Sequence, residues 1–248
     1  MTDFSKTLIR ASASGYLFVE PKAKADKDNG ELSQTCKTYL INSYIKEKYG
    51  REKDITTKQM AKGIDAEDDS IKMLSIHQNK ELNKNQERIS NDFITGLPDI
   101  YEGNAIMGCD FIWDVKTSYD IWTFLANIPD KLNPLYYYQL QAYMWLTGCS
   151  KSAIAYCLTD MPQHLIETER KKLLYQMNVI SEESPEYIEA AAGMEINLIY
   201  PDIPIQEKVL IYPVDRDDDV IEKMQQKVGK ARRFLIEFEE KHLNFNKK

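Results

Sequence analysis

Apolar residues recur at helical spacing in several stretches of this chain, and residues that cap helices border these stretches. The clearest pattern predicts a helix over residues 32–49, with Ser33 near its start and Gly50 after its end. Three later segments share the helical spacing: residues 163–179, 185–199 and about 218–242. Short apolar runs that are typical of interior strands occupy residues 153–158 and 208–214. The pattern therefore predicts a chain in which helices and strands are mixed.

One predicted helix carries an acidic residue among its apolar ones. This helix is capped by Thr56 or Thr57, and its apolar stripe consists of Met60, Ile64, Ile71 and Leu74. Glu67 falls on the same stripe, because the five positions lie within about 80 degrees of one another around a helix. Burial of an unpaired carboxylate is costly, so Glu67 is expected to meet a cation or to line a cleft. The alternative is a partly exposed residue at the boundary of the core.

A second polar residue interrupts an apolar face further along the chain. Asn133, followed by proline, is typical of a helix start, and Gly148 is typical of its end. Gln139 lies within the apolar face of this helix, and Tyr143 lies on its flank. A buried glutamine needs hydrogen-bond partners, which a ligand phosphate or a metal-bound water would supply.

Two β-favouring runs around a glycine-containing turn predict a hairpin. The first run contains Gly96-Leu97-Pro98-Asp99, and the second extends from Ala105 to Lys116. Side chains two residues apart on a strand share a face, so Asp114 and Lys116 are expected to emerge side by side. The proline before Asp99 places this acid where a strand ends or bends.

Composition supports a folded core and argues against a membrane protein. The chain has 248 residues, of which 43% are hydrophobic, and proline and glycine are too few for a disordered tail. No window approaches the roughly 18 apolar residues of a membrane span, and residues 1–6 have no apolar signal segment behind them. We therefore expect a cytoplasmic protein without a membrane partner. The cysteines are widely spaced, which argues against zinc and disulfides.

The net charge of −7 is unevenly distributed along the chain. Residues 61–130 contain 13 acidic and 6 basic residues. This segment holds the candidate metal ligands, and bound divalent cations would reverse its local field. Because the overall charge would repel a nucleic acid, any such partner has to be held by local basic patches. Arg10 and Ser12 offer a guanidinium and a hydroxyl that suit a phosphate, although they would serve equally well as surface or capping residues.

Five polar side chains are expected to converge at one edge of a sheet: Glu67, Asp99, Asp114, Lys116 and Gln139. The three carboxylates are hard oxygen ligands, which suit Mg²⁺ or Mn²⁺. Such ions lower the pKa of bound water and neutralise a leaving oxygen. Lys116 would orient that water or stabilise the charge that builds on a phosphate. This chemistry predicts phosphodiester hydrolysis.

The same residues form motifs that resemble a known family. Pro98-Asp99 followed by Asp114-Val115-Lys116 resembles the signature of the PD-(D/E)XK nuclease superfamily. Three further motifs are similar to the branch of phage lambda exonuclease and RecB-like enzymes: Arg10-x-Ser12, Gly63-x-x-x-Glu67 and Gln139-x-x-x-Tyr143. The resemblance implies an α/β (α+β) fold with a central mixed β-sheet flanked by helices, which is the restriction-endonuclease-like core.

The resemblance also implies a role for each site residue. Glu67, Asp99 and Asp114 would bind Mg²⁺ or Mn²⁺, and the backbone carbonyl of Val115 would assist. Lys116 would be catalytic, and Gln139 and Tyr143 would complete the catalytic set. Arg10 and Ser12 would contact DNA near its end. The iron–sulfur subset of this family carries closely spaced cysteines near the C-terminus, and no cysteine follows Cys157, so no iron–sulfur cluster is expected.

We expect a single nuclease domain over residues 1–248. Residues 1–56 would form a helical DNA-end-binding region, residues 57–160 the catalytic core, and residues 161–248 the helices and strand that complete the domain. The expected function is a Mg²⁺-dependent DNA exonuclease acting on duplex ends in phage-type recombination or DNA processing, in a bacterial host or phage-infected cell. Candidate partners besides DNA are a single-strand annealing protein and further copies of the chain. The alternatives are an endonuclease, a CRISPR-type end-processing nuclease, or a non-catalytic DNA-binding protein on a nuclease fold.

Overall fold

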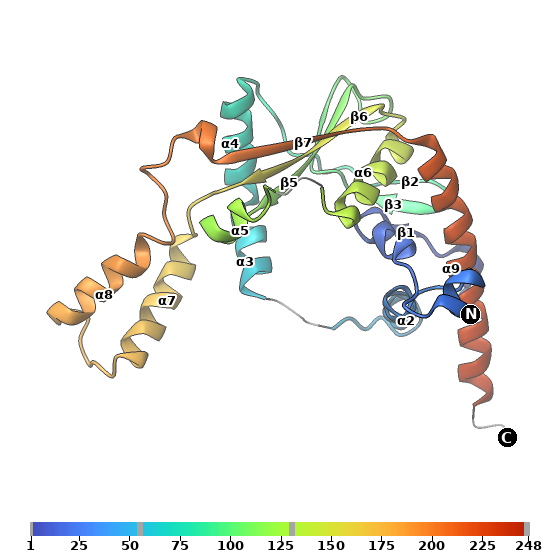
Figure 1. The fold of residues 1–248 in the computed structure, drawn as a ribbon, viewed down its shortest axis with the longest axis horizontal. Helices are drawn as coiled ribbons and strands as arrows, with labels where there is room; N and C mark the ends of the chain where they lie inside the picture. Colours follow the sequence, from blue (N-terminus) through green and yellow to red (C-terminus); the bar gives the residue numbers. More distant parts are fainter. Residues whose placement is uncertain (1, 54–56, 129–131, 246–248) are drawn as a thin grey trace.

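The computed structural model describes residues 2–53, 57–128 and 132–245 (Figure 1). Its α-helices are α1 (Lys24–Asp28), α2 (Gln34–Tyr49), α3 (Lys58–Asp65), α4 (Glu67–Gln78), α5 (Ile121–Leu125), α6 (Pro134–Thr147), α7 (Gln163–Gln176), α8 (Pro185–Glu195) and α9 (Asp218–Asn244). Its strands are β1 (Ile9–Arg10), β2 (Ile89–Ser90), β3 (Ile94–Gly96), β4 (Ile100–Glu102), β5 (Phe111–Thr117), β6 (Lys151–Cys157) and β7 (Val209–Asp215). Short 3-10 segments are η1 (Phe4–Lys6), η2 (Ala11–Phe18) and η3 (Ile205–Glu207).

The larger of two sheets is mixed and has the strand order β4-β5-β6-β7. Its central strands β5 and β6 are parallel, whereas β4 and β7 run antiparallel to their neighbours. The smaller sheet has the order β1-β3-β2 and joins the N-terminal β1 to the middle of the chain. Parallel neighbours need a crossover connection, and α6 lies in the one between β5 and β6.

Helices cover both faces of the larger sheet (Figure 1). On one face, Leu140 of α6 belongs to the same core cluster as Ile112 and Ile154 of the central strands. On the other face, Leu74 of α4 belongs to a second cluster with Trp113. Successive residues of a strand point to opposite faces, so this division follows the alternation along β5. The fold class expected from the sequence, a mixed sheet flanked by helices, is confirmed.

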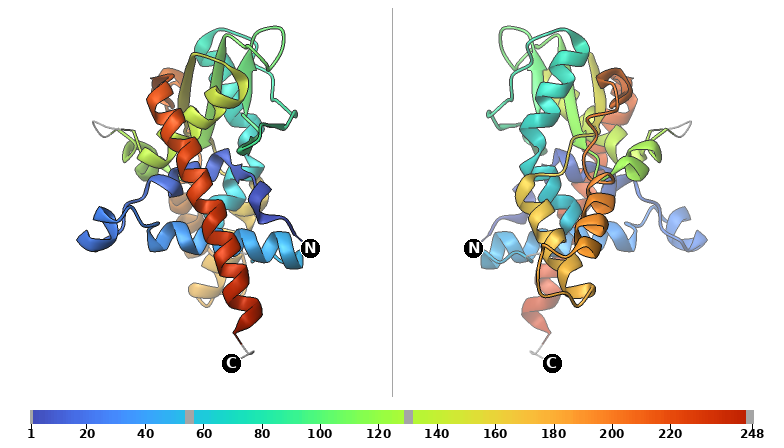
Figure 2. Two further views of the ribbon diagram at one scale, coloured as in Figure 1. Left: turned by 90° about the vertical axis from the view of Figure 1, so that its right-hand side faces the viewer. Right: turned by 90° about the vertical axis from the view of Figure 1, so that its left-hand side faces the viewer.

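The long C-terminal helix α9 packs against the N-terminal segments of the chain. It runs beside the N-terminal segments, as the left-hand view shows (Figure 2). The apolar face of α9 is buried and includes Met224, Val228 and Leu235, while Arg232 donates hydrogen bonds to the carbonyls of Thr7 and Asp92. The α7 and α8 helices instead form a hairpin that projects from the sheet (Figure 1). Within the described ranges, no helix combines the length and apolarity that crossing a bilayer requires.

Helix α2 begins and ends as predicted from its capping residues. The Ser33 side chain accepts a hydrogen bond from the N–H of Cys36, and Gly50 has the left-handed conformation that ends many helices. Asn133 caps α6 in the same way as Ser33 caps α2, and Gly148 follows its end. Thr57 caps α3, whereas Thr56 lies outside the described residues.

The prediction of one continuous amphipathic helix after Thr57 is wrong. The chain bends at Ala66, where φ is −107° and ψ is 12°, and α3 ends there before α4 begins. Met60 and Ile64 of α3 are 53% and 68% exposed, so they do not continue the buried stripe of α4. The buried residue of α3 is Lys62, because this helix meets the ends of β5 and β6 and not an apolar face.

The predicted hairpin is present, but its first strand is shorter than expected. The expected first run around Asp99 is divided between β3, which precedes Asp99 and lies in the small sheet, and β4, which follows it and lies in the larger one. The break falls at Leu97 to Asp99, where the proline has no N–H to contribute to a ladder. Residues 103–110 form a loop, so the second strand begins at Phe111 and not at Ala105.

Candidate active site

Two carboxylates face each other where β4 begins. The antiparallel register pairs Ile100 with Trp113, and its continuation by one residue places Asp99 opposite Asp114. Asp99 Oδ2 accepts a hydrogen bond of 2.7 Å from the N–H of Val115. The two acids are fifteen residues apart in the sequence, and the strand register brings them together.

Asp114 is fully buried and is held by side chains from two elements. Its Oδ1 accepts a hydrogen bond of 2.7 Å from Nε2 of Gln139 on α6. Its Oδ2 lies 2.6 Å from Nζ of Lys116, which is two residues further along β5. The same Gln139 nitrogen donates to the Tyr143 hydroxyl at 3.1 Å, and that hydroxyl donates to the Leu97 carbonyl at 3.2 Å. This chain of hydrogen bonds connects α6 to Asp114 on β5 and to Leu97 in the turn before Asp99.

The electrostatic field of the site affects Asp99 and Lys116 in opposite ways. Burial and the neighbouring Asp114 carboxylate raise the pKa of Asp99 from 3.8 to about 7. Burial would lower the pKa of Lys116, but Asp114 and Asp99 outweigh this effect and raise it. Lys116 is therefore a cation at neutral pH, and its Nζ also lies 5.1 Å from the centre of the Tyr136 ring.

The acid pair fits a hard divalent cation. Buried carboxylates that repel each other are stabilised by positive charge, and oxygen donors suit Mg²⁺ or Mn²⁺. Asp114 Oδ2 has no hydrogen bond of regular geometry despite its short distance to Lys116, so this oxygen retains acceptor capacity. Within the described residues, however, no three His, Cys, Asp or Glu side chains are grouped closely enough to surround one ion.

Glu67 is the expected ligand that stands apart from the acid pair. It is the first residue of α4, which packs on the face of the sheet opposite to Asp114. Its side chain is 30% exposed, and Oε1 lies 3.2 Å from Nζ of Lys84. Glu67 is near enough to contribute to the raised pKa of Asp99. The alternative of a partly exposed residue at the core boundary describes Glu67 better than full burial does.

Arg10 and Ser12 are both exposed and do not touch the acid pair. They flank the buried Ala11, whose Cβ lies 3.1 Å from the position that a Cβ on Gly96 would occupy. Ser14, two residues later, donates a hydrogen bond of 3.0 Å to the Tyr138 carbonyl of α6. The N-terminal motif therefore packs against β3 and against α6, the helix that carries Gln139, and its two polar side chains face solvent.

The structure adds polar residues that the sequence patterns did not single out. Lys62 is fully buried and donates to the carbonyls of Tyr119 and Thr159, and burial lowers its pKa to about 8. Asn85 is 7% exposed, and its side chain donates a hydrogen bond of 2.9 Å to the Pro98 carbonyl. Lys62 directly precedes the Gly63-x-x-x-Glu67 motif, but no local pattern marked it as buried. Asn85 lies in a polar segment between two predicted elements, and this segment shows neither helical nor strand periodicity.

A mixed sheet with an acid, a second acid opposite it and a lysine two residues away has the arrangement of the PD-(D/E)XK nucleases. No protein-family model matches this chain, and no curated protein sequence matches it significantly. Its similarity is to solved structures. A phage-related exonuclease from Haemophilus somnus 129PT has 26% sequence identity and a TM-score of 0.71, with 96% of this chain and 97% of the other covered.

An alkaline exonuclease from Laribacter hongkongensis, LHK-Exo, has 15% identity and a TM-score of 0.62, with 98% of this chain and 93% of the other covered. The same enzyme in complex with dAMP has 15% identity and a TM-score of 0.62, with coverage of 97% and 93%. The chain therefore has a lambda-exonuclease-like PD-(D/E)XK fold, and its structural neighbours are exonucleases. The resemblance drawn from the motifs is confirmed at the level of the fold.

Proposed function

We propose that this chain is a Mg²⁺- or Mn²⁺-dependent DNA exonuclease that hydrolyses phosphodiester bonds from duplex ends. The observation that carries the proposal is the pair formed by the partly buried Asp99 and the fully buried Asp114, with the Lys116 cation beside it. The similarity to exonucleases along nearly the whole chain supports the same reaction class. Phage-type recombination or DNA processing in the cytoplasm, with a single-strand annealing partner and further copies of the chain, is the setting that we propose for it.

The proposed roles of the site residues combine their contacts with the resemblance to the nuclease family. Asp99 and Asp114 would hold the cation, with Glu67 and the carbonyl of Val115 completing its ligands. When bound, the ion would supply an activated water and positive charge for the leaving oxygen. The Lys116 ammonium is placed to stabilise negative charge that builds on the phosphate.

Gln139 and Tyr143 would act by positioning. Gln139 fixes one oxygen of Asp114, and Tyr143 fixes the amide of Gln139 against the Leu97 carbonyl. A carboxylate held in one rotamer presents its other oxygen in one direction, which lowers the cost of assembling the site. We further propose that the exposed Arg10 and Ser12 bind the DNA backbone near the end.

The experiment is digestion of end-labelled linear duplex DNA beside closed circular DNA, with Mg²⁺, Mn²⁺ or EDTA. Linear DNA should be degraded from its ends with either metal, and closed circles and EDTA samples should remain intact. Lys116→Ala and Asp99→Asn should each reduce the rate by about a hundredfold or more, because both act on charge that develops in the transition state. Lys72→Ala removes an exposed lysine of α4 and should leave the rate unchanged.

Two outcomes would contradict this proposal. Cleavage of closed circles would identify an endonuclease, and intact linear DNA at all metal concentrations would favour a DNA-binding protein without nuclease activity. Lys116→Ala leaves the Asp114 carboxylate buried without its cation, which can cost about 3–5 kcal/mol of stability. Thermal melting is therefore recorded for every variant, and Asp99→Asn, which removes a charge from the acid pair, gives the independent measurement.

A further inference from the structure

Lys84 forms ion pairs with the candidate ligand Glu67 and with its neighbour Asp68. Its Nζ lies 3.2 Å from Glu67 Oε1 and 3.0 Å from Asp68 Oδ1. The Lys84 side chain is 40% exposed, the Glu67 side chain 30% and the Asp68 side chain 72%. Ion pairs with this much solvent exposure are weak, so the contact with Glu67 is readily exchanged for a stronger one.

The backbone of Lys84 is fixed to the strand that begins at the acid pair. Lys84 forms an isolated antiparallel bridge with Ile100 of β4. The N–H of Asn85 donates to the Asp99 carbonyl at 2.7 Å, and the buried Asn85 side chain donates to the Pro98 carbonyl. The segment that contains Lys84 and Asn85 is therefore hydrogen-bonded to the Pro98-Asp99 turn. These bonds fix the position of the Lys84 backbone relative to Asp99.

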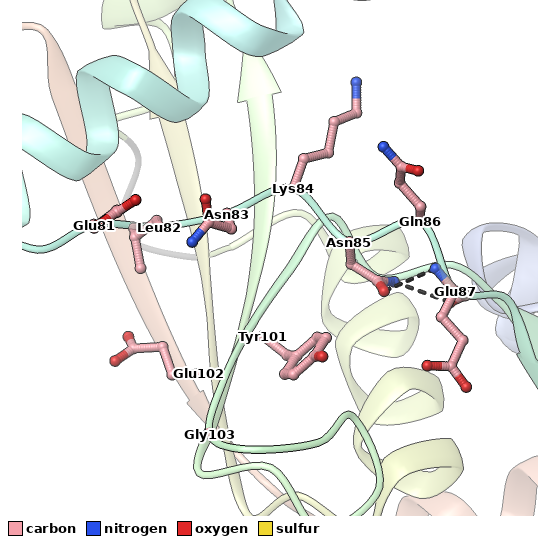
Figure 3. Close-up of a pocket in the computed structure, with 10 residues that line it drawn as sticks. All are labelled: Glu81, Leu82, Asn83, Lys84, Asn85, Gln86, Glu87, Tyr101, Glu102 and Gly103. Atoms are coloured by element: carbon pink, nitrogen blue, oxygen red, sulfur yellow. Dashed lines mark hydrogen bonds between the residues drawn. The ribbon is translucent and has the colours of Figure 1, made fainter.

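The Lys84 side chain extends away from a neighbouring hollow and toward the start of α4. Residues 81–87 border a hollow of about 760 Å³, with Tyr101 and Glu102 on its other side (Figure 3). Figure 3 shows the Lys84 side chain extending on the side of this segment opposite to Tyr101 and Glu102. The ammonium therefore pairs with the acidic residues at the start of α4 and does not extend into the hollow.

We infer that Lys84 is an exchangeable counterion, which pairs with Glu67 in the metal-free protein and is released toward the DNA backbone when a divalent cation binds. This inference rests on the proposed function, and it adds Lys84 to Lys116 as a second lysine that meets the DNA. A divalent ion at Asp99 and Asp114 would attract Glu67 and repel the nearby ammonium, since like charges repel strongly in a partly buried site. Once Glu67 turns to the ion, Lys84 keeps only the exposed Asp68 as a partner.

The salt dependence of DNA binding tests the release of Lys84. The association constant K for DNA decreases with salt concentration, and the plot of log K against log salt becomes shallower by about one unit for each phosphate contact that is lost. With Ca²⁺ present, Lys84→Met should reduce the slope by about one unit relative to the wild type. In EDTA, where Lys84 is paired with Glu67, the two slopes should agree. Lys80→Met is the matched control: Lys80 pairs with Glu102, away from Glu67, and its removal should leave both slopes unchanged.

Direct metal binding tests the competition for Glu67 without any cleavage. Titration with Mn²⁺, followed by electron paramagnetic resonance, should give a dissociation constant about two- to fivefold lower for Lys84→Met than for the wild type, because an exposed ion pair no longer competes. Lys80→Met should bind Mn²⁺ as the wild type does. A larger gain in Lys84→Met than in Lys80→Met supports the exchange over a general effect of net charge.

The outcomes separate this inference from the proposed function. Equal Mn²⁺ affinity of Lys84→Met and the wild type, or an equal loss of slope in Ca²⁺ and in EDTA, overturns the exchange even if the protein is an active exonuclease. Tighter Mn²⁺ binding by Lys84→Met in a protein that cleaves no DNA supports the exchange and overturns the nuclease proposal. A wild-type protein that binds no Mn²⁺ overturns both.

Discussion

The chemistry of the candidate site rests on three residues: the fully buried Asp114, the partly buried Asp99 and Lys116. Asp114 is fully buried, and its two oxygens face Gln139 and Lys116. The Lys116 ammonium and the N–H of Val115 stabilise the charged form of Asp99, but burial and the Asp114 carboxylate oppose its ionisation more strongly. The acid pair thus holds more negative charge than its own lysine can balance, which favours either a proton or a metal ion.

At the residue scale, the affinity for Mg²⁺ should depend on pH through Asp99. Its pKa of about 7 lies above the ordinary value of 3.8, so the folded metal-free protein binds a proton that the unfolded chain releases. The contribution of this proton to stability is complete below about pH 4 and is lost as the pH rises through 7. Because a metal ligand must be ionised, Mg²⁺ should bind about tenfold more tightly at pH 8 than at pH 6.

Isothermal titration calorimetry at pH 6 and pH 8, in two buffers of different ionisation enthalpy, measures both the affinity and the protons released. About one proton should be released per Mg²⁺ at pH 6 and almost none at pH 8. An affinity that is the same at both pH values would show that Asp99 is already ionised at pH 6.

At the scale of elements, the site depends on how closely α6 approaches the turn before Asp99. A Cβ on Gly96 would lie 2.8 Å from Leu146 Cδ1 and 2.9 Å from Tyr143 Cε1. Both atoms belong to α6, which also carries Gln139. The glycine in Gly96-Leu97-Pro98-Asp99 therefore allows the helix to pack against β3, and this packing brings Gln139 to Asp114.

Gly96→Ala should destabilise the protein and disturb the site together. Overpacking of a well-filled core costs about 1–3 kcal/mol, so the free energy of unfolding in urea should fall by that amount. The displaced Tyr143 would loosen Gln139, and Mn²⁺ binding should weaken as well. Gly63→Ala is the matched control, because Gly63 lies within α3 with no atom within 4 Å of its added Cβ, and it should gain about 0.5–1 kcal/mol. Equal stability of the two variants would contradict the close-approach argument.

At the scale of the whole molecule, the three regions expected from the sequence contribute to one core. The main apolar cluster contains Phe4 and Leu40 from residues 1–56, Leu140 from residues 57–160, and Met224 from the C-terminal region. Helix α9 contacts η1, η2 and α2, so the last helix of the chain covers its first segments (Figure 2). Removal of one region would expose apolar surface on the others.

We therefore predict that the chain unfolds as a single cooperative unit. In urea, tryptophan fluorescence, which reports on Trp113 and Trp145 of the core, and far-UV circular dichroism, which reports on all helices, should give coincident midpoints. Two separate transitions would show that one of the three regions is a domain of its own. The projecting α7 and α8 hairpin is the segment whose early loss would separate the two signals.

The sequence by itself determined what depends on neighbouring residues along the chain. Strand alternation placed Asp114 and Lys116 on one face, and helical spacing placed Gln139 beside Tyr143. Capping residues marked the ends of α2 and α6, since a cap acts within a single turn. The motifs built from these local patterns were specific enough to indicate the fold that the solved structures share.

Only the tertiary structure decided what depends on residues distant in sequence. Helical spacing cannot show that the chain bends at Ala66, or that Lys62 is buried, because the carbonyls that receive the Lys62 ammonium belong to Tyr119 and Thr159. For the same reason the pairing of Glu67 with Lys84 was not predicted: it depends on how α4 packs on β5 and on the bridge between Lys84 and Ile100 of β4. Periodicity specifies which side of an element is apolar, whereas packing specifies what covers that side.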